Sequence, residues 1–158
     1  MRKRSKYRPK PIRVDVMDYV KSGLKKFDDV SVAVDLRIRN HHAMEELRLG
    51  RATKDDIDVL IGAFNMVEGF ARLRPEFGAD WQAEIQAGQD ALFNMGRRGS
   101  LTNKFVCKAD ELVAMNLVME IHDAQLDQAT VRDLELAMDI VKEDFRTKRM
   151  RAVKEKQA

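Results

Sequence analysis

Cysteine, proline and glycine are scarce in this 158-residue sequence, which contains one, three and eight of them respectively. The lone cysteine, Cys107, excludes an internal disulfide and the usual thiolate zinc sites, so a reducing cytoplasm suits the chain. Few prolines and glycines leave long segments free to form helices. The composition is therefore typical of a helical protein.

Long hydrophobic runs are also absent, since nowhere do eighteen apolar residues follow one another. A membrane-spanning helix needs about that many. The N-terminus is basic enough to begin a signal peptide, but no apolar segment follows it. We therefore expect neither membrane insertion nor export by that route.

Acidic residues are missing from the first thirteen positions, MRKRSKYRPKPIR, which hold seven Lys and Arg. Residues 146–158 hold six more and a single acid, Glu155. The remaining residues, 14–145, contain 16 basic and 25 acidic side chains, so a body of net charge −9 carries two ends that total +12. Such segregation predicts that the ends and the body have different partners.

Residues 1–14 are expected to form an extended basic arm, because Pro9 and Pro11 prevent a helix through its middle. Lys and Arg placed on phosphates release counterions and give sequence-independent affinity, and an aromatic ring can stack on an unpaired base. The alternatives are a solvated tail that only aids solubility and docking on an acidic protein surface. The candidate nucleic-acid contacts in this arm are Arg2, Lys3, Arg4, Lys6, Tyr7 and Arg8.

The body, residues 15–145, is predicted to be a single helical domain. Residues 30–38 alternate apolar and polar side chains, which taken alone indicates a strand. Helical spacing continues to Leu47, however, and no second strand is available as a partner. A helix over 31–49 that ends at Gly50 is therefore favoured.

Two further helices follow in the sequence. Thr53 and Asp56 predict a capping box for a helix that ends before Pro75. Asp80 is the predicted cap of a shorter helix that ends at Gly96. The apolar face of this shorter helix is predicted to contain Trp81, Ile85, Leu92 and Met95.

The segment GRRGSLTNKFVCK, residues 96–108, is predicted to be a loop. Its glycines beside Arg97 and Arg98 could present backbone N–H groups and guanidinium groups to a phosphate. The alternative is a plain turn between helices, since glycine commonly ends a helix. The segment is not a Walker A loop, which requires Gly-Lys-Ser/Thr after a strand.

The strongest periodicity lies near the C-terminus. Asp110 is the predicted cap of one helix, and Thr130 with Asp133 predicts a capping box for the next. Each helix has apolar residues at alternating spacings of three and four, which predicts an antiparallel αα-hairpin and leaves a homodimer open. The two rows are Leu112, Met115, Met119, His122 and Leu126, and Val131, Leu134, Met138, Val141 and Phe145. The predicted fold class is an all-α bundle of about five helices.

Residues 146–158 are predicted to continue the last helix or to form a basic tail. Arg146, Arg149 and Arg151 could lie along a phosphate backbone. Cations are also favourable near any helix C-terminus, which is the alternative explanation.

Histidine and cysteine offer little for chemistry in this chain. His41 and His42 precede Glu45 and Glu46 at helical spacing, but a metal site needs further convergent ligands, so no metal or other cofactor is predicted. His122 is expected to be a core histidine. Cys107 has no histidine placed beside it by the sequence; its basic neighbours would lower its pKa modestly if it were exposed. We therefore expect no enzyme.

Three stretches, MRKRSKYRPK, GRATKDDIDVLIGAFNM and NLVMEIHDAQLDQATVRDLELAMDIV, resemble a group of small proteins of tailed bacteriophages and of prophages of proteobacteria. The resemblance spans most of the chain and carries no activity. It implies a setting, the cytoplasm of an infected bacterium. There, small proteins commonly bind nucleic acid, block a host protein or assist assembly.

The sequence thus favours a non-enzymatic phage accessory protein that binds nucleic acid or a nucleoprotein complex through its basic arms. The alternative is an inhibitor of a host protein, whose acidic helical body mimics nucleic acid. A metalloenzyme built around the histidine and glutamate pairs is the least favoured hypothesis.

Overall fold

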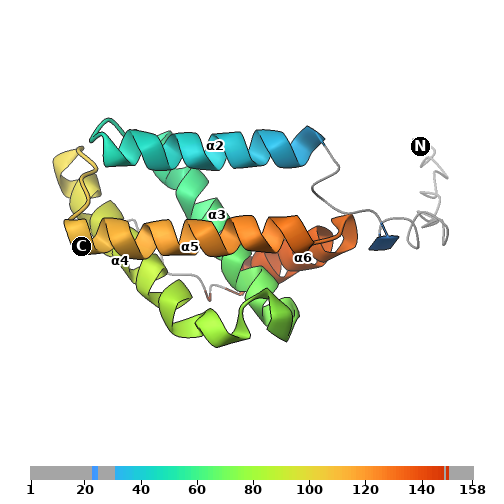
Figure 1. The fold of residues 1–158 in the computed structure, drawn as a ribbon. Helices are drawn as coiled ribbons and strands as arrows, with labels where there is room; N and C mark the ends of the chain where they lie inside the picture. Colours follow the sequence, from blue (N-terminus) through green and yellow to red (C-terminus); the bar gives the residue numbers. More distant parts are fainter. Residues whose placement is uncertain (1–22, 25–30, 148, 150–158) are drawn as a thin grey trace, which may run out of the picture.

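The computed structural model describes residues 23–24, 31–147 and 149 of the chain, so the expected basic arm, residues 1–14, lies outside it. Every regular element in these residues is helical, which confirms the predicted all-α bundle. Figure 1 shows α3 crossing between the other helices. The elements are α2 (Ser31–Arg48), α3 (Lys54–Leu73), η2 (Pro75–Phe77), η3 (Ala79–Trp81), α4 (Gln82–Thr102), α5 (Ala109–Gln128) and α6 (Val131–Arg146), where η marks a single 3₁₀ turn.

The helix α2 confirms the helical alternative for the segment with strand-like alternation. It ends in a Schellman motif: the N–H of Gly50 donates to the carbonyl of Leu47 at 3.0 Å, and the N–H of Arg51 donates to that of Glu46 at 2.8 Å. Gly50 has a φ of 71°, which favours glycine. The predicted stop is therefore correct.

The central helix α3 begins at the predicted capping box. The hydroxyl of Thr53 accepts from the N–H of Asp56 at 3.4 Å, and the carboxylate of Asp56 accepts from the N–H of Thr53 at 2.8 Å. The helix packs against α2, α4, α5 and α6, so it forms the centre of the core. Its buried apolar side chains include Ile57, Leu60, Phe64, Val67, Phe70 and Ala71.

The helix α4 differs from its prediction at both ends. Asp80 is not its cap: Trp81 occupies the N-cap position without a side-chain hydrogen bond, and the indole is half-exposed instead of lying on the apolar face. The helix also continues through Gly96 to Thr102. Sequence signals for caps and stops were overridden here by packing.

Glycines allow α4 to pack closely against its neighbours. A Cβ at Gly88 would lie 2.1 Å from a methyl carbon of Val118 on α5, and one at Gly99 would lie 2.1 Å from the ring of Phe105. Glycine is used here because no side chain fits between the segments. Gly88 therefore allows α4 to approach α5, and Gly99, which the predicted loop contained, lies within α4 against the connection over residues 103–108.

The helix α5 begins two residues earlier than predicted, at Ala109, because its N-cap is Lys108 and not Asp110. The N–H of Lys108, at the N-cap position, donates to the carboxylate of Glu111 at 2.9 Å, so Glu111 and not Asp110 satisfies this helix end. Met115, Met119, His122 and Leu126 are buried, as the predicted apolar row requires.

The helix α6 begins at the predicted capping box of Thr130 and Asp133. Its packing differs from the prediction, because it lies mainly on α3 and does not pair its apolar row with that of α5. Its buried residues are Asp133, Ala137 and Asp144. The predicted pairing of the two apolar rows is therefore wrong. The helix α6 ends at Arg146, and residues 148 and 150–158 of the predicted helix extension or tail lie outside the described residues.

The core consists of two clusters of buried apolar residues. The larger cluster joins α2, α3, α4 and α5, and includes Leu47, Phe64, Met95 and Met115. The smaller one lies where α3 meets α6, and in it the rings of Phe70 and Phe77 contact edge to face at 5.5 Å. Within the described part of the chain, no helix is long and apolar enough to cross a membrane.

Candidate nucleic-acid interface

The predicted nucleic-acid contacts divide into two groups. Four of them, Arg97, Arg98, Arg146 and Arg149, belong to the described residues. The others lie outside these residues, namely Arg2, Lys3, Arg4, Lys6, Tyr7, Arg8 and Arg151. The structure therefore shows the surroundings of the candidates at the end of α4 and at the C-terminal border of the body, where α6 ends.

Arg97 and Arg98 lie on the last turns of α4, so the predicted loop over residues 96–108 is wrong. The connection is shorter and comprises residues 103–108, beginning at Asn103 with a φ of 54°. A glycine-rich phosphate loop is thereby excluded at this position. What remains is a helix end that carries cationic side chains.

Arg98 is held by the protein itself. Its guanidinium donates to both carboxylate oxygens of the buried Glu111, at 2.7 and 2.5 Å, and at 3.3 Å to the carbonyl of Val106. Arg98 and its hydrogen bonds to Glu111 hold the pKa of that carboxyl below its usual range. Arg98 thus joins α4 to α5, and Glu111 neutralises its charge, so that it contributes little to the attraction of a phosphate while this contact is intact.

Exposed cations surround this helix junction. Arg97, Lys104 and Lys108 are exposed, and no carboxylate among the described residues forms an ion pair with them. We call these three residues the α4–α5 cationic tip. Asp110 is the exposed acid closest to them in sequence, so the tip is positive overall.

Two arginines of the C-terminal border, Arg146 and Arg149, belong to the described residues, and of these Arg146 forms an ion pair there. Arg146 donates to the carboxylate of Glu143 at 2.9 and 2.6 Å, and both side chains are exposed. Arg149 is exposed, and its N–H donates to the carbonyl of Asp144 at 2.9 Å where α6 ends. An exposed ion pair is weak and screened by salt, so Arg146 can exchange Glu143 for a phosphate.

Most of the other arginines of the body form ion pairs with carboxylates of the body itself. Arg74 reaches the buried Asp133 at 2.7 Å, Arg72 pairs with the buried Asp144, and Arg37 reaches Asp127 at 2.5 Å. These pairs attach α6 to α3 and α2 to α5. The sequence did not reveal them, because partners far apart in sequence carry no local signal.

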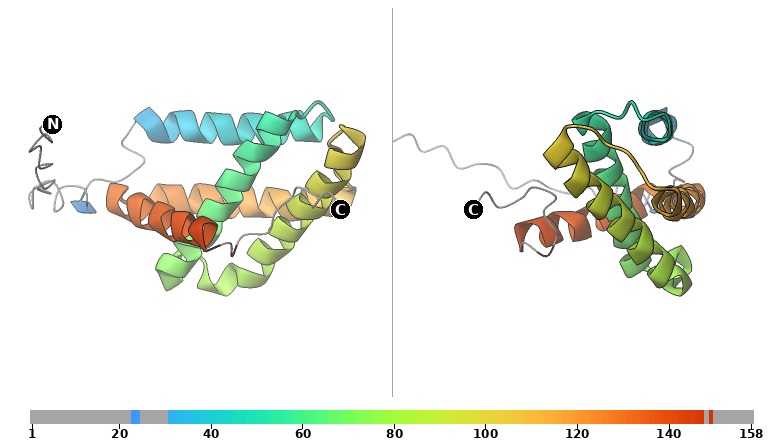
Figure 2. Two further views of the ribbon diagram at one scale, coloured as in Figure 1. Left: turned by 180° about the vertical axis from the view of Figure 1, so that it is seen from behind. Right: turned by 90° about the vertical axis from the view of Figure 1, so that its left-hand side faces the viewer.

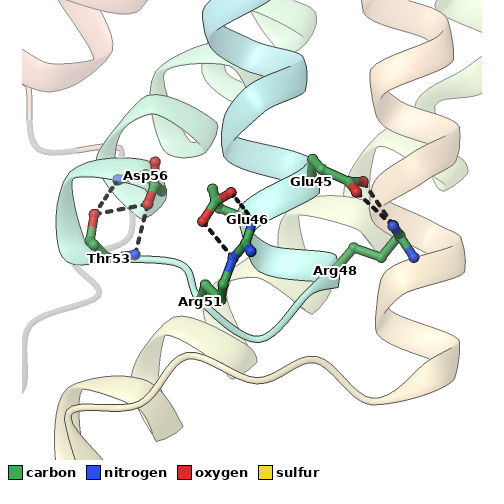
Figure 3. Close-up of polar contacts among 6 residues, drawn as sticks. All are labelled: Glu45, Glu46, Arg48, Arg51, Thr53 and Asp56. Carbon is green, nitrogen blue, oxygen red and sulfur yellow. Dashed lines mark hydrogen bonds and ion pairs between the residues drawn. The ribbon is translucent and has the colours of Figure 1, made fainter.

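The histidine and glutamate pairs of α2 also have other partners, as Figure 3 shows for the glutamates. Glu45 accepts from Arg48 at 2.6 and 2.8 Å, and Glu46 accepts from Arg51 at 2.6 and 3.1 Å. These arginines hold the pKa values of both carboxyls below their usual range. His41 bonds through Nε2 to Asp123 at 2.8 Å. In the part of the chain that is described, no three His, Cys, Asp or Glu side chains are grouped to hold a metal ion.

His122 and Cys107 are set apart from solvent. Burial lowers the pKa of His122 to about 4, which agrees with the expected core histidine. Burial raises the pKa of the half-buried Cys107 thiol to about 11, and its Sγ lies 3.8 Å from the Sδ of Met115. The lowering expected from Lys104 and Lys108 requires an exposed thiol, and it does not apply to the half-buried Cys107, whose desolvation raises the pKa. Cys107 is therefore a thiol, not a nucleophilic thiolate, at neutral pH.

Comparison with known proteins does not assign a family or a function to this chain. No protein-family model, curated protein or solved structure matches the chain at a significant level.

Proposed function

We propose that this chain is a non-enzymatic nucleic-acid-binding accessory protein that contacts phosphates through its cationic ends. The observation that carries the proposal is the commitment of the body's arginines to its own carboxylates. Arg37, Arg48, Arg51, Arg72, Arg74 and Arg98 all have such partners. Among the described residues, cations without a carboxylate partner therefore gather at the α4–α5 cationic tip and at Arg149. The basic sequences of both ends add further positive charge.

The rest of the described surface of the body also has few cations without a carboxylate partner. Among the described residues outside the tip and the C-terminal border, every exposed cation except Arg39 and Lys54 has a carboxylate within ion-pair distance. A polyanion is repelled by the net negative body and attracted by the ends. Contact through the ends would release counterions and give affinity without base recognition. The bacterial cytoplasm implied by the sequence resemblance is the proposed setting.

The proposal is tested by fluorescence anisotropy with short labelled DNA and RNA at low salt. The key variant replaces every Lys and Arg of residues 2–13 and 146–156 by Gln within the full-length chain. We expect its affinity to fall by at least about 100-fold, because most phosphate contacts are removed.

A matched control removes body charges that already have partners, in the double variant Arg48→Gln/Arg51→Gln. It should bind within about threefold of the wild type, since both arginines are neutralised by adjacent glutamates. Equal binding by the wild type and the end-neutralised variant would remove the proposal.

A second candidate, inhibition of a host nucleic-acid-binding protein by the acidic body, is favoured by one observation. Several exposed carboxylates have no ion-pair or hydrogen-bond partner among the described residues, including Asp35, Asp55, Asp58, Glu76, Asp80 and Glu120. Capture of a DNA-binding protein from nuclease-treated bacterial lysate, followed by its competitive release with DNA, would support this candidate. Failure to release any captured protein with DNA would count against it.

A further inference from the structure

The outer face of α6 carries an apolar row that the bundle leaves uncovered. Figure 2 shows α6 at the periphery, in front of α3 in the rear view. Val131, Met138 and Phe145 follow one another at intervals of seven residues, and such residues share a helix face. Phe145 is 76% exposed and Met138 is 40% exposed, while Val131 is half-buried.

The rotation of α6 about its axis explains this exposure. Its buried side carries Asp133 and Asp144, which pair with Arg74 and Arg72 of the α3 region. Between them, the backbone at Ala137 comes so close to Gly69 that a Cβ there would lie 2.9 Å from the Ala137 carbonyl oxygen. These contacts turn the apolar row about a quarter-turn away from α3. The row therefore faces outward although α6 is firmly attached.

Two exposed residues of opposite charge lie beside the row, one on each side of Met138. Glu135 and Lys142 are exposed and lie on the solvent side of the row, three or four residues from Met138. Lys142 has only a loose contact of 3.9 Å with Asp139, and both of those side chains are about 70% exposed. The row and its charges thus run as Val131, Glu135, Met138, Lys142, Phe145 along the helix.

We propose that this row is the interface of an antiparallel homodimer, with the α6 helix of a second copy as its occupant. A two-fold axis at Met138 sets Phe145 of one copy against Val131 of the other, so a large side chain meets a small one. The same axis sets Glu135 of each copy beside Lys142 of the other, which gives two complementary ion pairs. Such an isologous contact is the usual form of a homodimer interface. A parallel pairing would set Lys142 beside Ala137 and would form no ion pair.

The dimer is tested by sedimentation equilibrium of nuclease-treated, full-length protein over a range of concentrations. The wild type should approach twice the 18.2 kDa chain mass. Glu135→Lys and Lys142→Glu, each alone, place like charges together and should weaken dimerisation by at least about tenfold. The double variant Glu135→Lys/Lys142→Glu should recover wild-type dimerisation, because the swap restores both pairs.

The rescue separates this interface from a role within one chain. Glu135 and Lys142 are about 10 Å apart along the same helix and cannot contact each other there. Phe145→Ser should also weaken the dimer, and its exposure means that the fold should be unaffected. A wild type that stays monomeric at every concentration would overturn the proposal, as would a dimer that none of these variants alters. These measurements contain no nucleic acid, so they stand or fall separately from the proposed function.

Discussion

His122 shows how one buried side chain makes stability depend on pH. Its ring is 1% exposed on α5, and burial lowers its pKa from 6.5 to about 4. The unfolded chain therefore binds a proton more readily than the folded chain between these two values. Stability should be greatest above pH 6.5 and should decrease as the pH falls toward 4.

We expect the free energy of unfolding to fall by about 2 kcal/mol between pH 7.5 and pH 5 because of this histidine. Urea denaturation at intermediate pH values measures the slope. The slope should be much smaller in His122→Leu and unchanged in His42→Gln, which removes an exposed histidine. An identical slope in wild type and His122→Leu would show that His122 is not the group responsible.

Two helical glycines, Gly88 on α4 and Gly62 on α3, allow the same substitution to be compared in a crowded and in an open position. A Cβ at Gly88 would lie 2.1 Å from the nearest atom of Val118 and 3.1 Å from the carbonyl oxygen of Ala114, whereas a Cβ at Gly62 would have nothing within 4 Å. Gly88→Ala should destabilise the protein by roughly 1–3 kcal/mol through overpacking. Gly62→Ala should stabilise it by roughly 0.5–1 kcal/mol, because alanine is the better helix former.

Chemical denaturation of both variants measures the difference. A Gly88→Ala protein that is as stable as Gly62→Ala would mean that α4 and α5 do not approach each other as closely as described.

At the scale of whole elements, the attachment of α4 to α5 depends on Arg98 and Glu111. Their two charge-assisted hydrogen bonds are partly screened, because the arginine is partly exposed. Glu111→Gln should lower the free energy of unfolding by about 1 kcal/mol, since it removes the charge that holds Arg98. Glu45→Gln breaks an exposed pair with Arg48, three residues away on the same helix, and should produce no measurable change.

Equal stability of these two variants in thermal or chemical denaturation would contradict the assigned role of Glu111. A second expectation follows from the direction of its pKa: the stabilisation by Glu111 should be lost as the pH falls below the normal range of a carboxyl group.

The helices whose ends are defined by local chemistry could be predicted from the sequence. Thr53 with Asp56 and Thr130 with Asp133 form reciprocal caps within four residues, and Gly50 supplies a positive φ at the end of α2. Such signals depend on neighbouring residues alone. For the same reason, the ends of α2, α3 and α6 were predictable, whereas α5 was predictable from its apolar spacing and not from its cap.

The features that the sequence did not predict depend on contacts between distant segments. Gly96 predicts a helix end, but α4 continues through it to Thr102. The apolar spacing of α6 predicts one core-facing row, but only part of that row packs inward, as Leu134 does. Met138 and Phe145 are exposed, while Asp133 and Asp144 occupy the buried side and pair with Arg74 and Arg72. A periodic apolar pattern reveals a helix face and does not reveal whether an ion pair rotates that face away from the core.

At the scale of the whole molecule, charge is divided between a negative body and positive ends. The structure adds that most of the body's arginines are held by its own carboxylates, so they contribute little to attraction of a polyanion. Dimerisation through α6 would place four basic ends on one particle. If the basic ends of both copies contact one nucleic acid, the avidity rises although each copy makes the same contacts as before.

Binding of phosphates by the basic ends is best measured through the salt dependence of nucleic-acid affinity. The logarithm of the association constant should fall linearly with the logarithm of salt concentration, with a slope of about −0.9 for each duplex phosphate neutralised. Replacing the Lys and Arg of residues 2–13, and then those of residues 146–156, by Gln should make the slope shallower at each step. Salt-independent binding, or a slope that neither set of substitutions changes, would contradict the account.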